Sequence, residues 1–364
     1  MIRRLWLLLV RHVDNFLLVA LVATMGLGLV ILYSASGQSF ERVLSQSISM
    51  LVALVVMWGL ANLPPQHLMR IAWPSYVIGL LLLLGVAQFG EISHGARRWL
   101  HVGVSRIQPS ELMKIAVPLM LAWYFEKRER SMRLSDFAVA AILLLLPVIL
   151  IAKQPDLGTA LLIAASGFYV LFLAGIGWKV IVGLAVSAAA FAPVAWSLMH
   201  DYQQQRILTL LDPTQDPLGT GYHTIQSTIA LGSGGLFGKG WLNGTQAHLD
   251  FLPERHTDFI FAVLGEEFGL FGILVLLTLY VLIIARGLYI TSHATTMFTR
   301  LIAGSITLTF ATYAFVNMGM VSGILPVVGV PLPLISFGGT SLVTMALGFG
   351  ILMGVSTHRR LVKQ

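Results

Sequence analysis

Apolar residues in this chain form long runs that short polar segments interrupt. A helix that crosses a membrane needs roughly 20 consecutive, mostly apolar residues, and about ten runs reach that length. The pattern therefore predicts an all-α integral membrane protein with about ten transmembrane helices. The predicted spans are 13–33, 43–62, 71–90, 107–125, 137–152, 156–175, 179–200, 258–285, 298–320 and 334–356.

Most connections between the predicted spans are short. The segment from about 201 to 257 is too long to serve only as a connection, and long loops often carry function. The chain has no evident internal repeat and no linker rich in proline, glycine and serine, so we expect one polytopic membrane domain over residues 1–364. The first span continues through residues 26–35 without a signal-peptide cleavage site, and we expect it to remain as an anchor.

Composition and charge agree with a membrane protein. Of the residues, 57% are hydrophobic and 11% are charged, which excludes an ordinary soluble domain. Basic residues concentrate in cytoplasmic loops of such proteins, so we expect both termini in the cytoplasm and the 201–257 loop outside. This placement of the charge also argues against a nucleic-acid partner. The basic residues beside the spans are Arg3, Arg4, Arg11, Lys127, Arg128, Arg130, Arg133, Arg359, Arg360 and Lys363.

Two predicted helix starts on the outer side have similar sequences, QPSE at 108–111 and QPD at 154–156. Proline suits the first helical turn because it has no amide hydrogen to lose, and an acidic residue there meets the positive end of the helix dipole. Helix capping is therefore the simplest role for Asp156.

Capping explains Lys114 less well, because this lysine lies within the apolar part of the fourth span. Glu111 and Lys114 are three residues apart and share a helix face, so they can form an ion pair. The pair is either self-sufficient, or Lys114 binds an anion. Arg97 and Arg98 precede this helix in a loop of the same side, next to Trp99, which is either an interface anchor or a ligand contact.

Asp258 immediately precedes the apolar stretch FIFAVLG of the eighth span. Thr257 or Asp258 can cap this helix through a side-chain oxygen. Alternatively, a carboxylate half out of water has a raised proton affinity, which is what a general base near neutral pH requires. Further along the span, at least one of Glu266 and Glu267 must point into the bundle, which indicates a buried polar network or a cation site.

Two glycine-rich segments have more than one interpretation. The first lies in the long loop, and its glycines either cradle a phosphate through backbone amides or form tight turns; no Walker pattern follows. The last span is also dense in small residues, which favours close helix packing. The glycines of the loop are Gly232, Gly234, Gly235, Gly238 and Gly240, and the small residues of the span include Gly338, Gly339, Ser341 and Gly348.

Five motifs together resemble the SEDS family of peptidoglycan glycosyltransferases. They are GARRWL, QPSELMK, KQPDLGTALL, FLPERHTDFIFAVLGEE and NMGMVSGILPVVGVPLPLISFGGTS, which begin at residues 95, 108, 153, 251 and 317. Their order and the ten spans match along the whole chain, and the likeness is greater to the elongation branch than to the division branch. Phe337 is a departure, because the family often has tyrosine there.

The resemblance implies an enzyme of the bacterial cytoplasmic (inner) membrane that polymerises lipid II at the outer face. Asp258 corresponds to the essential outer-loop aspartate of the family, and a base is needed to take a proton from the attacking hydroxyl. The pyrophosphate leaving group requires cations, first Lys114 and Arg98, and a divalent ion, Mg²⁺ or Mn²⁺; no organic cofactor is implied. The other cationic candidates are Arg97, Arg206 and Arg255. Glu111 either positions Lys114 or contributes to an ion site. Gln154 and Asp156 are expected to line the same cavity.

The resemblance also implies the substrates and partners. These are lipid II, the nascent glycan strand, membrane lipids and a class B penicillin-binding protein that acts as transpeptidase. A polyprenyl tail predicts an apolar groove that opens to the bilayer.

Two other functions stay open at this point. A flippase for the same lipid-linked precursor would use intramembrane charge and glycine-broken helices. A non-catalytic scaffold would tolerate replacement of Asp258 by asparagine. A carboxylate at the outer interface favours catalysis, whereas one at the membrane midplane favours transport.

Overall fold

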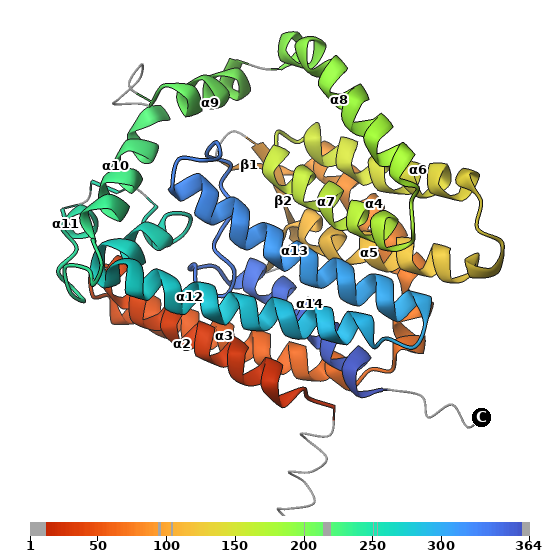
Figure 1. The fold of residues 1–364 in the computed structure, drawn as a ribbon, viewed down its shortest axis with the longest axis horizontal. Coiled ribbons are helices and arrows are strands. Elements are labelled where there is room, and N and C mark those ends of the chain that lie inside the picture. The colour runs from red at the N-terminus through yellow and green to blue at the C-terminus, as the bar shows by residue number, and fades with distance from the viewer. Residues whose placement is uncertain are drawn as a thin grey trace, which may run out of the picture.

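The predicted apolar runs form long helices in the structure, a computed structural model that describes residues 12–93, 96–102, 105–199, 201–213, 220–249, 251–252 and 254–358 (Figure 1). The described residues contain ten long helices, and each overlaps one predicted span. They are α2 (Asn15–Ala35), α3 (Phe40–Ala61), α4 (Pro65–Phe89), α5 (Pro109–Glu126), α6 (Leu134–Ala152), α7 (Leu157–Leu173), α8 (Trp178–Leu198), α12 (Ile260–Ser292), α13 (Met297–Val321) and α14 (Gly339–Thr357).

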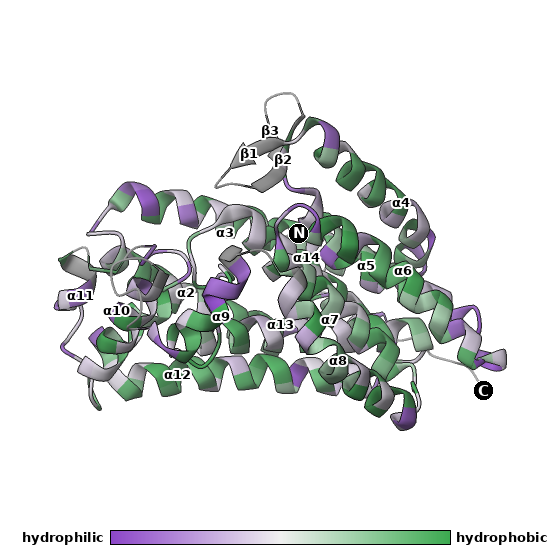
Figure 2. Cartoon of the chain, turned by 90° about the horizontal axis from the view of Figure 1, so that it is seen from above, coloured by the Kyte–Doolittle hydropathy of each residue, from purple (hydrophilic) through white to green (hydrophobic). Residues whose placement is uncertain are grey.

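Eight of these helices are long and apolar enough to cross a membrane. Of the other two, α7 has 17 residues, and α5 carries Glu111 and Lys114 near its start. Hydrophobic residues cover most of the helices, whereas hydrophilic residues gather towards helix ends and connections (Figure 2). The prediction of a helical, multi-span membrane protein is confirmed.

Local sequence explains where several helices begin. The carboxylate of Asp14 accepts a hydrogen bond from the Leu17 amide at 3.1 Å and caps α2. Asp156 caps α7 in the same way, through the Thr159 amide at 3.3 Å, which confirms the capping interpretation. Such caps satisfy amides that have no partner within the first helical turn.

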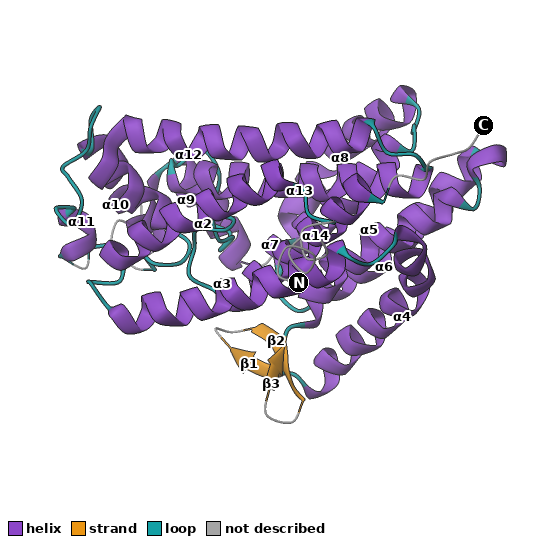
Figure 3. Cartoon of the chain, turned by 90° about the horizontal axis from the view of Figure 1, so that it is seen from below, coloured by secondary structure: helices purple, strands orange, loops and turns teal. Residues whose placement is uncertain are grey.

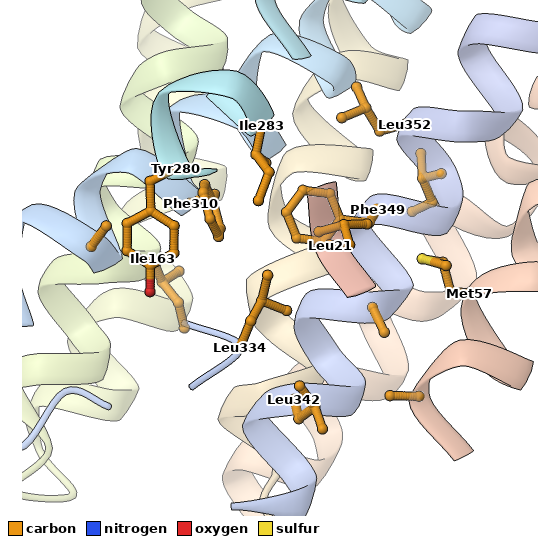
Figure 4. Close-up of a cluster of buried hydrophobic side chains, with 14 of the residues drawn as sticks. Leu21, Met57, Ile163, Tyr280, Ile283, Phe310, Leu334, Leu342, Phe349 and Leu352 are labelled. Carbon is orange, nitrogen blue, oxygen red and sulfur yellow. The ribbon is translucent and has the colours of Figure 1, made fainter. Parts of the chain in front are cut away.

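The core lies around α13, which packs against α5, α7, α12 and α14. Phe310 of α13 makes near-perpendicular ring contacts with Tyr280 and Phe349, each with centroids 5.2 Å apart (Figure 4). Small residues let α14 approach its neighbours, because a Cβ on Gly350 would lie 2.5 Å from the Met57 carbonyl oxygen of α3. The predicted packing role of the small residues in the last span is therefore confirmed.

A three-stranded antiparallel sheet precedes α5, a feature that the sequence analysis did not predict. Its strands β1 (Glu91–Ser93), β2 (Ala96–Val102) and β3 (Ser105–Ile107) pair in chain order, with Leu100 opposite Ile107. The sheet lies at the edge of the helical bundle, beside one end of α4 (Figure 3).

The predicted long loop contains three helices, α9 (Asp201–Leu211), α10 (Thr220–Ser233) and α11 (Thr245–His248). The α10 helix packs on α12, and the buried Ser227 hydroxyl donates to the Val321 carbonyl of α13 at 2.9 Å. The loop therefore packs back onto the helical bundle. By contrast, none of the described residues of α8 is buried, and α8 stands apart from the other long helices (Figure 1).

The glycine-rich part of this loop forms tight turns against α12. The amides of Lys239 and Gly240 donate to the carbonyls of Glu266 and Glu267 at 2.9 and 3.0 Å. A Cβ on Gly238 would lie 2.1 Å from the Glu267 oxygen, so this approach requires glycine. The tight-turn interpretation is confirmed, because these amides bond to protein carbonyls and cannot cradle a phosphate.

The two glutamates of α12 both point into the protein. The Glu266 carboxylate accepts bonds from Lys239 Nζ at 2.7 Å and from the Thr245 amide at 2.8 Å. Glu267 accepts a short hydrogen bond from the Ser34 hydroxyl of α2. Both acids are buried because Gly269, with φ of 62°, breaks the helix and admits the glycine turns. The predicted buried polar network is therefore present.

Candidate functional site

Asp258 lies in a tight segment, residues 254–259, that ends where α12 begins. The amides of Thr257 and Phe259 donate to the Glu254 carbonyl at 3.1 and 3.3 Å. Phe259 occupies the N-cap position of α12 without a side-chain cap, and the Thr257 hydroxyl donates to the Glu254 carboxylate at 2.9 Å. The interpretation of Thr257 or Asp258 as the helix cap is therefore wrong, because this turn closes on Glu254 instead.

The carboxylate of Asp258 is partly buried and has no hydrogen-bond partner among the described residues. Gly329 borders it, since a Cβ on that glycine would lie 3.4 Å from Asp258 Oδ2. Burial, and then the negative charge of Glu254, raise the pKa of Asp258 to about 6. Near neutral pH this carboxylate is ionised yet more basic than an ordinary one, which suits proton abstraction.

Lys114 and Glu111 form the predicted ion pair. Lys114 Nζ lies 2.6 Å from Glu111 Oε1, and the two side chains are only 12% and 15% exposed. The ammonium group also lies 5.2 Å from the ring centroid of Tyr313 on α13. Cation–π contact and ion pairing together hold the lysine in one position.

The pair does not satisfy all polar groups around it. Glu111 Oε2 and Thr309 Oγ1 are buried and have no hydrogen-bond partner within the described part of the chain, while the buried Tyr313 hydroxyl lies close to the Lys114 ammonium group. All three residues line one cavity between α5, α13 and α14, together with Lys114. Buried polar atoms are normally satisfied, so these atoms leave hydrogen-bonding capacity for a water molecule or a small polar group at the cavity wall. The ion pair is therefore present as predicted, and anion binding by Lys114 stays a prediction.

An apolar groove adjoins this cavity. The groove has a volume of about 500 Å³ and lies between α3, α5 and α14. Glu111 and Thr344 line both the groove and the cavity, so the groove ends at the ion pair. The groove agrees with the predicted binding surface for a lipid tail, and most of its lining is apolar: Ile48, Val52, Ile107, Leu112, Val343 and Leu347.

Asn317 of α13 links Asp258 to this second site. Its Nδ2 donates to the Asp258 carbonyl at 2.8 Å and to the Val330 carbonyl at 2.7 Å. Tyr313 lies four residues earlier, on the same face of the helix and about 6 Å along its axis. One face of α13 therefore holds the Asp258 segment and contacts Lys114.

The other predicted site residues have separate surroundings. Gln154 donates to the Leu83 carbonyl of α4 at 3.0 Å, which is a structural contact. Arg206 of α9 is exposed and borders a small pocket with Thr224. Arg255 Nε donates to the Ala35 carbonyl at 2.8 Å.

The first turn of α7, which Asp156 caps, lies close to the segment that borders Asp258. A Cβ on Gly158, two residues after Asp156, would lie 2.9 Å from the Val328 carbonyl oxygen, next to Gly329.

The side chains of Arg97 and Arg98 lie outside the part of the chain that the structure describes. Sequence reasoning missed Tyr313, Thr309 and Asn317 as site residues, although Asn317 opens the last of the five motifs.

Known proteins resemble this chain over nearly its whole length. The model of the FtsW, RodA and SpoVE family, described as cell cycle protein, matches residues 10–361. The peptidoglycan glycosyltransferase MrdB of Escherichia coli (strain K12) is 52% identical over 357 residues, which covers 97% of this chain and 96% of that protein. A probable peptidoglycan glycosyltransferase FtsW of Geobacter metallireducens is 35% identical, with 96% of each chain covered.

Solved structures agree with these matches. One matching chain comes from a structure that describes the coordination of polymerization and crosslinking by a peptidoglycan synthase complex. That chain is 35% identical, with a TM-score of 0.83, and the match covers 96% of this chain and 99% of that chain. The rod shape determining protein RodA of Thermus thermophilus is 32% identical, with a TM-score of 0.73 over 96% of this chain and 98% of that chain. These matches confirm the resemblance that the five motifs indicated, and the chain belongs to the FtsW, RodA and SpoVE family.

Proposed function

We propose that this protein is a peptidoglycan glycosyltransferase of the RodA type, which polymerises lipid II into glycan strands during cell elongation. Membership of the family and 52% identity to MrdB support this activity. The observation that carries the mechanism is Asp258, a partly buried carboxylate without a hydrogen-bond partner among the described residues, whose pKa is raised to about 6.

In this reaction the 4-hydroxyl of one glucosamine unit attacks the anomeric carbon of the lipid-linked chain. Asp258 accepts the hydroxyl proton as the new C–O bond forms. The bond from the anomeric carbon to the pyrophosphate oxygen breaks, and the lipid pyrophosphate leaves with its electron pair. Such an inverting displacement requires a base next to the attacking hydroxyl and stabilisation of the negative charge on the leaving group.

Lys114 is the first candidate to stabilise the leaving pyrophosphate. Its ammonium group has hydrogen-bond capacity beyond the single bond to Glu111, and the hydroxyls of Tyr313 and Thr309 line the same cavity. The polyprenyl tail would lie in the adjoining apolar groove. Glu111 holds Lys114 in place. Arg98 is the second cationic candidate, followed by Arg97, Arg206 and Arg255, with Gln154 and Asp156 as further candidates to line the site.

A divalent cation, Mg²⁺ or Mn²⁺, would neutralise charge on the pyrophosphate. No group of three or more histidine, aspartate or glutamate side chains in the described ranges could hold such an ion. Mg²⁺ commonly binds one or two carboxylates together with substrate phosphates, and the unpartnered Glu111 Oε2 beside Lys114 suits that arrangement. The substrate would therefore supply most of the ligands.

The proposed topology places both termini in the cytoplasm and Asp258 at the outer face of the inner membrane. Asp258 precedes the first residue of α12, at the end of a membrane helix, and this position supports catalysis over transport. We also propose a class B penicillin-binding protein as partner, since a chain of similar fold occurs in a peptidoglycan synthase complex.

The test is polymerisation of lipid II by the purified protein in detergent, with a divalent cation and a transpeptidase-inactive penicillin-binding partner. Glycan chains are followed on gels for the wild type and for Asp258→Asn. Polymer from the wild type and at least about 100-fold less from a folded Asp258→Asn variant would support the proposal. Equal polymer from both would remove Asp258 from catalysis. If neither makes polymer and lipid II still crosses vesicle membranes, the protein is a flippase.

A further inference from the structure

Three consecutive carbonyls of the Asp258 segment each accept a hydrogen bond from a distant part of the chain. The amide of Phe337 donates to the His256 carbonyl at 2.9 Å. The hydroxyl of Ser336 donates to the Thr257 carbonyl at 2.6 Å, and Asn317 Nδ2 donates to the Asp258 carbonyl at 2.8 Å. The peptide units on both sides of the Asp258 Cα are thus fixed by residues of distant segments.

The donors of these bonds are themselves buried and fixed. Asn317 is 0% exposed, and Ser336 is 6% exposed and also accepts a bond from the Leu332 amide at 2.8 Å. Gln46 of α3, 1% exposed, bridges the Ser336 carbonyl and the Gly338 amide at 3.2 Å each. Buried donors of this kind, each bonded to a main-chain carbonyl, specify one arrangement of the backbone, while Asn317 Oδ1 has no hydrogen-bond partner in the described part of the chain.

Asn317 acts on two sides of the Asp258 carboxylate. Its Nδ2 holds the Asp258 carbonyl and also the Val330 carbonyl, the latter at 2.7 Å. Val330 follows Gly329, which has φ of 71° and borders Asp258 Oδ2. A single amide group therefore holds both the main chain that carries the carboxylate and the turn that borders it.

We propose that Asn317 and Ser336 are positioning residues, which hold the carboxylate of Asp258 in the orientation and the partly buried environment that proton abstraction requires. The inference rests on the proposed role of Asp258 as the general base. It also gives a physical role to the SFGG sequence at 336–339, in which Ser336 and the Phe337 amide bond to the Asp258 segment.

Loss of either side chain would release one peptide unit and admit water to the carboxylate. A misplacement of about 1 Å can reduce a rate about 100-fold. Hydration would also lower the pKa of Asp258 from about 6 towards its ordinary value of 3.8. The other charged or titratable groups near this segment include Glu254, Arg255 and His256 within it, Arg42 of α3, and His223 of α10, whose ring stacks on Phe259.

The experiment compares Ser336→Ala and Asn317→Leu with the wild type in the lipid II assay with the inactive transpeptidase partner. Leucine keeps the volume of Asn317 and removes both donors. Initial rates are measured from pH 5 to 8 and at several lipid II concentrations. The matched control is Ser227→Ala, which removes a buried hydroxyl that donates to the Val321 carbonyl at 2.9 Å, away from Asp258. Ser336→Thr keeps the hydroxyl and tests rescue.

We expect kcat to fall at least about tenfold in both variants, with little change in KM, and the acid limb of the rate profile to move below pH 6. Ser227→Ala should keep the wild-type profile, and Ser336→Thr should recover activity. Wild-type kcat and pH profile in both folded variants would overturn the positioning role. Asp258→Asn, measured alongside, separates the two ideas: if it is fully active, the base assignment itself fails.

Discussion

Lys114 and Glu111 form an ion pair of 2.6 Å on one face of α5, and the pair borders both a small cavity and an apolar groove. An isolated pair and a pyrophosphate site make different predictions for a charge exchange. Lys114→Glu combined with Glu111→Lys keeps both charges three residues apart, so the double variant should regain most of the thermal stability that Lys114→Ala loses.

Activity should not return with this exchange, because the cation would face a different part of the cavity. Thermal unfolding in detergent and lipid II polymerisation measure the two properties. Full recovery of polymerisation in the double variant would mean that the pair is structural only and that Lys114 does not bind the pyrophosphate.

The raised pKa of Asp258 predicts how stability depends on pH. Because the pKa is about 6 in the folded protein and ordinarily 3.8, the folded state binds the proton more tightly than the unfolded state. The stabilisation from this proton is complete below pH 3.8 and is lost as the pH rises through 6. Asp258→Asn has no such loss, so at pH 7.5 it should be more stable than the wild type, by up to about 3 kcal/mol.

Thermal unfolding between pH 4 and 7.5 tests this dependence, and the advantage of Asp258→Asn should shrink towards the acid end. Glu129→Gln, which removes an exposed carboxylate before α6, controls for the loss of a surface charge. A wild type that is more stable than Asp258→Asn at pH 7.5 would contradict the assigned burial of the carboxylate.

The groove between α3, α5 and α14 predicts sensitivity to side-chain size. Val52 of α3 lines the groove and is 48% exposed. Val52→Trp would fill part of the space for a lipid tail, so KM for lipid II should rise several-fold while stability changes little. Val55→Trp is the control, because Val55 lies on the same helix, is 59% exposed and is absent from the groove lining. Equal effects of both substitutions on KM would argue against a lipid tail in this groove.

The contact between α14 and α3 predicts opposite outcomes for two glycines. Gly350→Ala would place a Cβ 2.5 Å from the Met57 carbonyl oxygen, so it should destabilise the protein by about 1–3 kcal/mol. Gly26 of α2 has no heavy atom within 4 Å of such a Cβ. Gly26→Ala should therefore be neutral or slightly stabilising, because alanine loses less conformational entropy in a helix. Thermal unfolding of the two variants distinguishes close packing from a general intolerance of alanine.

The sequence by itself determined the spans, the helix cap at Asp156 and the charged pair. Apolar runs of membrane-spanning length can only form helices in lipid, since every backbone polar group must be satisfied within the segment. The cap at Asp156 and the pair of Glu111 with Lys114 involve residues three apart, so local helical geometry suffices to predict them.

Tertiary structure decided the surroundings of the two candidate sites. Tyr313 reaches Lys114 only because α13 packs against α5, and Asn317 reaches Asp258 only because the chain returns 59 positions later. The local signal at Asp258 was misleading, since a residue before an apolar helix usually caps it, whereas here the turn closes on Glu254.

Close contacts between backbone segments could not be predicted from the sequence either. Glu266 and Glu267 are both buried because the glycine turns of a loop that precedes them by some thirty residues lie against the break at Gly269. Periodicity assigns residues to the faces of one continuous helix, so it cannot anticipate a broken helix that buries adjacent side chains. Hydrophobic length is a property of a segment alone, whereas burial and proton affinity depend on which distant segments pack around a group.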